Sequence, residues 1–362
     1  MTQATSGHSI SHLPELDGLR GIAVLLVVAS HIVSPLIPGV SGVTLFFFIS
    51  GFIITRMMLA APSDQLLPFY IRRFFRLFPT LFAYSIASLL VMRAFGHEVA
   101  WKAAVAALLF LTNYSPFDPA GYFTLTWSLA VEEHFYLLFP LAMLVFKQRT
   151  QIVLTMCLVT CLALRIHFAG VIPDGAIQGY THFRIDSIAW GCLLSMMIHK
   201  RAEIAYAKIL DFMSSRTGAL IGAALLISSF AIRDPIFRVT FRFSVQGLAL
   251  MFLFAGLFYR SPRNVFSKAL SSKPLTFVGT ISYSLYLWHM MGHMVAAEMG
   301  YKWLDSVPLA LGIGVPCAVL SYYFIETPAR KFGTRLARQV AARGAHDAMP
   351  SLMAGGEDRQ QR

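Results

Sequence analysis

The sequence has few charged residues and few cysteines for its length. Only 13% of its 362 residues are Asp, Glu, Lys or Arg, whereas a soluble globular protein carries about 25%. So little charge cannot coat a water-soluble particle of this size, but lipid-facing residues can be apolar. The four cysteines all lie in apolar stretches, so they indicate neither a disulfide framework nor a metal site.

Two other features are missing, a cleavable leader and a nucleic-acid-binding pattern. Residues 1–18 are polar and have no basic region ahead of the first apolar run, so we expect a retained first helix. The net charge is +12. The bias of Lys and Arg toward the cytoplasmic loops of membrane proteins explains that excess, so we expect no nucleic-acid partner.

Hydrophobic residues make up 56% of the chain and gather in runs of membrane-spanning length, about 20 residues. These runs predict an all-α, polytopic membrane helix bundle of about ten transmembrane helices. An eleventh run, 101–113, is about half a span, and we expect it to be a short re-entrant or interfacial segment. The ten longer runs lie near residues 19–37, 40–61, 77–95, 124–146, 151–171, 181–198, 217–232, 243–259, 279–298 and 307–326.

The distribution of Lys and Arg orients the expected bundle. With the N-terminus inside, most basic residues fall in cytoplasmic connections and in the C-terminal tail. This predicts a cytoplasmic N-terminus over residues 1–18, a transmembrane domain over 19–330 and a disordered, basic cytoplasmic tail over 331–362. Both termini are then cytoplasmic, and membrane lipid surrounds the domain.

The first expected helix carries ionisable residues, which are costly inside a bilayer and therefore functional candidates. Asp17, Arg20 and His31 lie in LDGLRGIAVLLVVASH. Arg20 and His31 are eleven residues apart, so they share one helix face at about 16 Å along the axis. This distance excludes direct contact, and the alignment leaves catalytic and structural roles for His31 equally open.

The segment FYIRRFFRLFP carries three arginines just before the third span. Arg73 and Arg76 are three residues apart and are neighbours on a helix, with Arg72 beside them. They could anchor the helix to lipid head groups. They could also clamp a phosphorylated ligand, since Arg binds phosphate bidentately.

The segment TWSLAVEEHFYLLFP places two adjacent carboxylates inside a span. Ser128, Glu132 and Tyr136 recur at four-residue spacing and form one polar stripe, whereas Glu133 points about 100° away. We therefore expect Glu132 to face the interior, where it could meet and orient His31. A proton relay in a transporter is the alternative for such a buried Glu.

Two later segments hold further polar candidates. In RIDSIAWG, Arg184 and Asp186 are two residues apart, so they do not face each other and each needs another partner. In ISYSLYLWH, Tyr286 and His289 are three residues apart on one face. Aromatic side chains at such depth are usually packing residues, so His289 is the more informative of the two.

Taken together and in this order, these segments resemble the membrane acyltransferase family three. The resemblance runs from about residue 13 to 331 and adds Ser50 and Trp127 to the candidates. Two positions depart from the family pattern: His134 stands where Gln is commoner, and Thr44 stands where an acidic residue is frequent. These departures affect the expected acceptor specificity more than the expected reaction. The matching segments are LDGLRG with His31, FFFISGFIIT, RRFFRLFP, WSLAVEEHFYL, RIDSIAWG, ISYSLYLWH and ETPAR.

The resemblance implies an integral membrane O-acyltransferase of the bacterial inner membrane. Such proteins move an acyl group, expected to be acetyl, from cytoplasmic acyl-CoA to a hydroxyl, without a metal. Their acceptors include cell-surface glycans, lipid-linked sugars and macrolides. Many relatives add an extracytoplasmic hydrolase-like domain, which these 362 residues do not include, so we do not expect peptidoglycan in particular.

The family likeness also implies roles for individual residues. Arg73, Arg76 and Arg72 would bind the CoA phosphates, and Arg20, counted among the catalytic residues, would help to hold them at the cytoplasmic end of the first helix. His31 would act as general base toward the acceptor hydroxyl, or as a covalent acyl carrier, with Glu132 orienting it.

A proton-coupled transporter is the alternative function, with Glu132, His31, Arg184 and Asp186 as its relay. Transporters usually show paired halves, and no internal repeat is present. A membrane receptor or scaffold without enzymatic activity is the third hypothesis. The receptor or scaffold hypothesis gives no reason for the alignment of Arg20 with His31 on one helix face.

Overall fold

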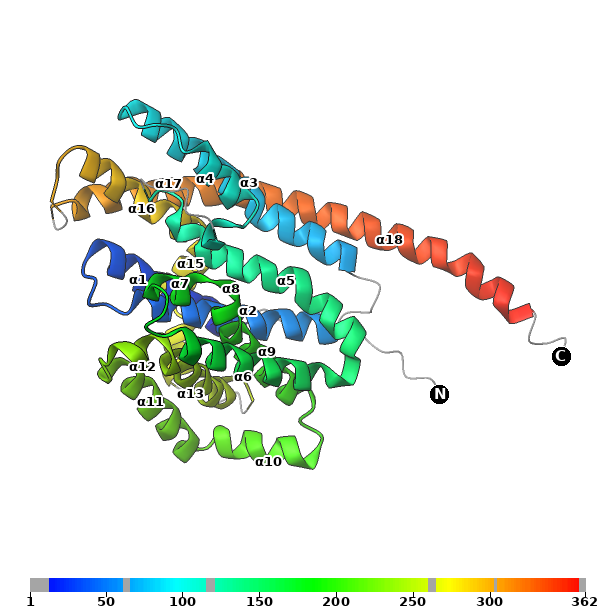
Figure 1. Cartoon of the computed structure of the whole chain (residues 1–362). Coiled ribbons are helices and arrows are strands. Elements are labelled where there is room, and N and C mark those ends of the chain that lie inside the picture. The colour runs from blue at the N-terminus through cyan, green and yellow to red at the C-terminus, as the bar shows by residue number, and fades with distance from the viewer. Residues whose placement is uncertain (1–12, 61–65, 115–120, 260–264, 303–304, 358–362) are drawn as a thin grey trace.

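The computed structural model describes residues 13–60, 66–114, 121–259, 265–302 and 305–357, with side chains as far as residue 343. This part of the chain is helical and contains no strand, which confirms the all-α class (Figure 1). The elements in chain order are α1 Pro14–Ile32, α2 Gly39–Ala60, α3 Leu66–Ala94, α4 Trp101–Leu108, η1 Thr112–Tyr114, η2 Thr124–Thr126, α5 Trp127–Phe146, η3 Lys147–Arg149, α6 Thr150–Phe168, α7 Asp174–Gly179, α8 Thr181–Arg184, α9 Asp186–His199, α10 Ile204–Met213, α11 Arg216–Ala231, α12 Pro235–Val239, α13 Phe241–Phe258, α14 Val265–Leu270, α15 Lys273–Thr280, α16 Ser282–Glu298, α17 Val307–Ser321, the π-helix η4 Tyr322–Glu326, and α18 Thr327–Glu357.

Several of these helices are long and apolar enough to cross a membrane. Among the described residues they number five, or six if α10 and α11, bent by 65°, form one span. The predicted count of about ten spans is not confirmed, because α9 has 14 residues and α16 has 17, fewer than the about 20 that a bilayer requires. The five candidate spans are Gly39–Ala60, Leu66–Ala94, Thr124–Phe168, Phe241–Phe258 and Val307–Arg343. The third of these contains both α5 and α6.

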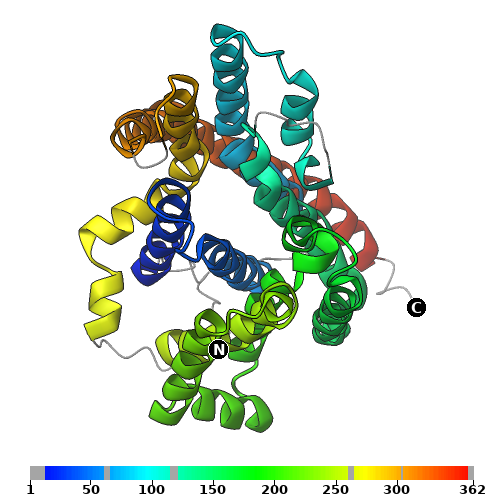
Figure 2. The same ribbon diagram turned by 60° about the vertical axis from the view of Figure 1, so that its left-hand side comes forward.

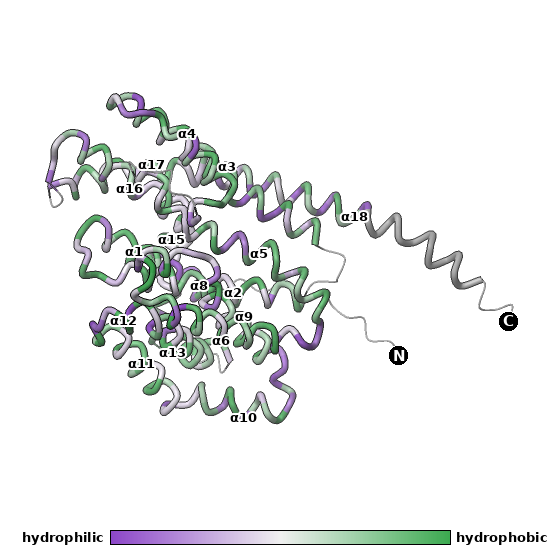
Figure 3. Tube along the Cα trace, viewed as in Figure 1, coloured by the Kyte–Doolittle hydropathy of each residue, from purple (hydrophilic) through white to green (hydrophobic). Residues whose placement is uncertain are grey.

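The short apolar run at 101–113 forms a short helix. Its helix, α4, has 8 residues and is therefore about 12 Å long, less than half of the about 30 Å hydrocarbon core. This length agrees with the expectation that the segment does not cross the membrane. Figure 3 shows polar colour along the described part of α18 and in several connections, among them the one before α10.

The centre of the bundle is built on α1 and α2, which the later helices surround (Figure 2). One of the close approaches in the bundle is between α2 and α9. A Cβ atom at Gly51 would collide with the Ile188 carbonyl, and one at Gly191 would collide with the Phe48 carbonyl. Small residues let helix backbones approach this closely, so the two glycines fix how α2 and α9 cross.

The C-terminal tail differs from its expectation. Disorder was predicted from residue 331, but α18 continues there as a helix that lies along α3 (Figure 1). The rings of Phe332 and Phe75 are 5.0 Å apart, and Gly333 lies against the same Phe75 side chain. The prediction was wrong over residues 331–343 because apolar positions within a polar sequence form one packing face.

The chain ends fall partly outside the described residues. Residues 1–12 of the expected N-terminal segment and residues 358–362 of the expected tail are not described. Within the described part, α1 begins at Pro14, earlier than the predicted start at residue 19, with the proline in the first turn, where its fixed φ suits a helix.

Candidate functional site

Three arginines and a glutamate from three helices line one small cavity, which we call the arginine cavity. Its volume is about 50 Å³, enough for water. Arg20 comes from α1, Arg73 and Arg76 come from α3, and Glu132 comes from α5. The full lining is Arg20, Val43, Phe46, Phe47, Ser50, Arg73, Arg76, Leu77, Ser128, Leu129, Glu132, Ser282, Tyr283 and Tyr286.

Arg73 is bound by the carboxylates of α5. Its Nη2 lies 2.5 Å from Glu133 Oε1 and 3.5 Å from Glu132 Oε1, and its guanidinium lies 3.3 Å from the centre of the Tyr136 ring. Arg73 therefore links α3 to α5. Since both carboxylates already neutralise it, Arg73 is a weaker candidate for a phosphate clamp than its place in the motif implied.

Arg76 differs from Arg73 in its surroundings. It lines the arginine cavity, and its Nε is buried with no hydrogen-bond partner among the described residues. An unpaired buried donor of a charged group is costly, so this guanidinium is suited to receive an anion. Arg72 is partly buried and does not belong to the cavity lining that the structure describes.

Glu132 faces the cavity, as the polar stripe on α5 predicted. It accepts hydrogen bonds from Ser50 of α2 and, at 3.1 Å, from Tyr136. Ser128, one turn earlier on the stripe, bonds to the hydroxyl of Tyr286 at 2.6 Å. The stripe thus joins α5 to α2 and to α16.

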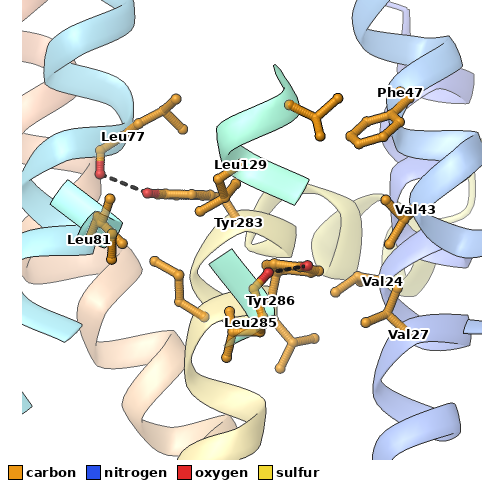
Figure 4. Packing of buried hydrophobic residues seen from close by; sticks show 14 of the residues in the cluster. Val24, Val27, Val43, Phe47, Leu77, Leu81, Leu129, Tyr283, Leu285 and Tyr286 are labelled. Atoms are coloured by element: carbon orange, nitrogen blue, oxygen red, sulfur yellow. Dashed lines mark hydrogen bonds between the residues drawn. The ribbon is translucent and has the colours of Figure 1, made fainter. Parts of the chain in front are cut away.

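Two tyrosines of α16 close the other side of the cavity. The Tyr283 hydroxyl donates to the Leu77 carbonyl of α3 at 2.8 Å, and Tyr283 extends toward that helix (Figure 4). The Tyr286 hydroxyl donates to the Leu125 carbonyl at 2.7 Å. The tyrosine hydroxyls therefore anchor α16 to α3 and to the start of α5, and the rings form part of the cavity wall.

His31 and His289 form a pair next to this wall. His31 Nδ1 lies 3.2 Å from His289 Nε2, and His289 Nδ1 lies 2.6 Å from the Tyr286 carbonyl. A carbonyl can only accept, so His289 Nδ1 carries the proton and donates it. A neutral His289 then accepts at Nε2 from the Nδ1–H of His31, which leaves the lone pair of a neutral His31 on its Nε2.

This pairing corrects the expectation that Glu132 meets and orients His31. The hydrogen bonds and ion pairs recorded for Glu132 go to Ser50, Tyr136 and Arg73, whereas His289 is bonded to His31. Sequence spacing placed Glu132 and His31 in the same interior but could not say which helix lies against α1. Arg20 lines the arginine cavity together with Tyr283 and Tyr286 of α16, and His31 contacts His289 of the same helix.

Arg184 and Asp186 each have a partner elsewhere, as their spacing predicted. Arg165 Nη2 lies 2.7 Å from Asp186 Oδ2, and both side chains are fully buried. Arg184 donates to the Thr44 hydroxyl at 2.9 Å, and its guanidinium lies 3.7 Å from the centre of the Phe243 ring. None of these three charged groups belongs to the described lining of the arginine cavity, and no contact among the described residues joins them to Glu132 as a transporter relay would need.

The sequence analysis missed two residues, Arg165 and Glu133, as specific partners. Arg165 lies within an apolar run, and an ionisable residue there is a candidate by default, so that signal was available. The polar stripe points to Glu132 rather than Glu133, although Glu133 makes the shorter contact with Arg73. Which carboxylate an arginine approaches depends on the crossing of α3 and α5, which spacing does not give.

The remaining candidates lie at the edges of this site. Trp127 contacts Phe47 of the arginine cavity, with ring centres 6.2 Å apart. The Asp17 carbonyl lies against Gly279 of α15, and Asp17 does not belong to the described cavity lining. Within the described ranges, no cluster of three His, Cys, Asp or Glu residues could hold a metal ion.

Comparison with known proteins agrees with the motifs. The chain is 29% identical to the peptidoglycan O-acetyltransferase OatA of Listeria monocytogenes, over 91% of this chain and 57% of that protein. It is 30% identical to the O-acetyltransferase OatA of Staphylococcus aureus, over 90% of this chain and 58% of that protein. The chain thus spans less than three fifths of the length of these relatives. No solved structure matches it.

A family model described as an acyltransferase domain matches residues 13–326. This range includes the arginine cavity and the paired histidines. Because the match covers most of the sequence, the chain belongs to the membrane acyltransferase family three, which its motifs resemble.

Proposed function

We propose that this chain is a bacterial membrane O-acetyltransferase. It would move an acetyl group from acyl-CoA to a hydroxyl of a cell-surface glycan or lipid-linked sugar. The observation that carries the proposal is the buried Nε atom of Arg76, which has no hydrogen-bond partner among the described residues, in a cavity that Arg76 shares with Arg20. Such a cationic cavity suits the phosphates of a CoA thioester.

The donor would bind at the end of the arginine cavity formed by Arg20 and Arg76. Arg73, held by Glu132 and Glu133, would fix the shape of the site and position its neighbours. The cavity volume of about 50 Å³ is far below the about 300–1,000 Å³ of ligand sites. Donor binding therefore requires the surrounding side chains to move.

His31 would be the general base toward the acceptor hydroxyl. His289 fixes its tautomer, because the Tyr286 carbonyl holds the proton of His289 on Nδ1 and the His289 Nε2 accepts from His31. The free lone pair on His31 Nε2 can then take the proton of the hydroxyl as oxygen attacks the thioester carbon, and CoA leaves as the thiolate. General-base catalysis contributes about 10²–10⁴-fold.

The experiment uses the full chain in lipid nanodiscs, acetyl-CoA labelled in the acetyl group, and an envelope extract of glycans and lipids. Mass spectrometry follows the label. We expect label on a hydroxyl with the wild-type protein and none with His31→Ala, which should still bind acetyl-CoA. Full transfer by His31→Ala would overturn the role of His31. Uptake of solute without any labelled product would instead favour a transporter.

A second pair of variants separates positioning from packing. His289→Leu removes the acceptor that fixes the His31 tautomer, whereas His289→Gln keeps an oxygen near the position of Nε2. We expect kcat to fall about 100-fold or more in His289→Leu, to recover partly in His289→Gln, and the acetyl-CoA KM to stay the same in both. Equal activity in the two variants would mean that His289 only fills space.

A further inference from the structure

A second cavity lies next to the arginine cavity and contrasts with it in chemistry. We call it the aromatic cavity. It has a volume of about 600 Å³, within the about 300–1,000 Å³ range of ligand sites. Residues from α2, α4, η1, α5, α7 and the adjoining connections line it. Its chemically informative residues are Asn113, Thr124, Trp127, Gly175, Gln178 and Tyr180.

The described lining of this cavity contains no Asp, Glu, Lys, Arg or His. Aromatic rings, two amides and hydroxyl groups take their place. The arginine cavity, by contrast, has three arginines and one glutamate in its wall. A charged ligand such as CoA suits the arginine cavity. The aromatic cavity suits a neutral molecule that offers apolar faces together with many hydroxyl groups.

Asn113 gives this wall an unsatisfied hydrogen-bond acceptor. Its side chain is buried, with 6% of its surface exposed. Its Nδ2 donates to the Thr181 hydroxyl at 2.8 Å and to the Gly179 carbonyl at 3.4 Å, and a carbonyl partner fixes which end of the amide carries the nitrogen. Thr181 in turn contacts His134 Nδ1 at 2.7 Å, so the amide is held firmly.

The Oδ1 atom of Asn113 has no hydrogen-bond partner among the described residues. Leaving such an acceptor buried and unpaired is costly, so a ligand hydroxyl that donates to it would be bound favourably. The anchored amide therefore favours ligands with a hydroxyl at one position and gives the cavity a means of selection.

Trp127 connects the two cavities. Its indole lines the aromatic cavity and forms a T-shaped contact with Phe47, which lines the arginine cavity, with ring centres 6.2 Å apart. The neighbouring Ser128 belongs to the arginine cavity. A ligand resting on Trp127 is thus one aromatic layer away from the region where the donor would bind.

We propose that the aromatic cavity binds the acceptor as a neutral sugar ring. The ring would stack on Trp127 and donate a hydroxyl hydrogen bond to Asn113, and these two residues would determine acceptor specificity. This inference rests on the proposed acetyltransferase function, because only a transferase has an acceptor. Binding of a sugar to the aromatic cavity can nevertheless be measured without any reaction.

Gly175 allows the cavity to be blocked without harm to the fold. A Cβ atom there would meet nothing within 4 Å, and the residue lines the cavity. Gly175→Trp therefore adds bulk at the cavity wall. Gly312 of α17 also has open space around it and lies outside the lining, so Gly312→Trp is the matched control.

The test measures binding of fluorescent tri-N-acetylglucosamine to the full chain in nanodiscs, and of acetyl-CoA in parallel. We expect Gly175→Trp and Asn113→Ala to weaken sugar binding about tenfold or more, while acetyl-CoA binding stays unchanged. Gly312→Trp should behave as wild type. So should Tyr114→Phe, which removes the bond to His182 outside the cavity.

Sugar binding that survives Gly175→Trp, or a wild-type protein that binds a macrolide but not the sugar, would overturn the inference. Failure of the proposed function has a different signature. In that case the wild-type protein would bind no acetyl-CoA, while the sugar would still bind and Gly175→Trp would still block it.

Discussion

Arg73 and Arg76 lie one turn apart on α3, yet their surroundings differ. Arg73 contacts two carboxylates, whereas the Nε of Arg76 is buried without a partner among the described residues. A hydrogen bond to a charged group is worth about 1.5–3 kcal/mol. The two arginines of one motif therefore differ, because Arg73 links α3 to α5, whereas Arg76 is the one that we propose binds the donor.

This difference leads to a prediction for donor affinity. Arg76→Ala should weaken acetyl-CoA binding about 10- to 100-fold, since about 1.5–3 kcal/mol is lost, with little change in melting temperature. Arg93→Ala, at the exposed end of the same helix, is the control and should bind normally. Isothermal titration in nanodiscs measures both. Equal affinities for the two variants would remove Arg76 from the donor site.

Part of this site can be predicted from the sequence. The stripe of Ser128 and Glu132 and the single face of Arg20 and His31 follow from helical periodicity, and the structure shows both. The bond between His31 and His289 could not be predicted, because it depends on which helix packs against α1. Periodicity tells which residues share a face, but not which face of another helix they meet.

At the scale of elements, the close crossing of α2 and α9 gives a prediction for stability. Gly191→Ala would place a Cβ against the Phe48 carbonyl, and backbone cannot move aside as a side chain does. Overpacking typically costs about 1–3 kcal/mol, so a lower melting temperature is expected in detergent. Gly256→Ala on α13, with open space around it, should leave the melting temperature unchanged. Equal melting temperatures for the Gly191→Ala and Gly256→Ala variants would contradict this explanation of the packing.

Element boundaries were predicted best where apolar runs were long. The run at 40–61 corresponds closely to α2, and the run at 243–259 to α13. The run at 181–198 is divided into α8 and α9. There Arg184 and Asp186 bond to different partners. Hydropathy alone does not show such a break in the helix, because the break depends on contacts with Thr44 and Arg165.

At the scale of the whole molecule, the proposed orientation in the membrane can be tested by cysteine labelling. With the N-terminus inside, residues 101–113 lie outside and Lys273 lies inside. Leu109→Cys, which is 61% exposed, should react with a membrane-impermeant maleimide in intact cells. Lys273→Cys should react only after permeabilisation. The native cysteines are buried or half-buried and set the background. The reverse pattern would invert the topology.

The aromatic contact between Phe47 and Trp127 has a consequence for the cell's energy supply. If the two cavities open to opposite faces, an open passage between them would dissipate the proton gradient. The Arg184 guanidinium lies 5.6 Å from the Phe47 ring centre and 5.9 Å from that of Trp127. The layer between the cavities therefore carries a positive charge beside two aromatic rings, and a fixed arginine repels protons in other pores. Acetyl transfer across this layer would therefore leave the membrane electrically sealed.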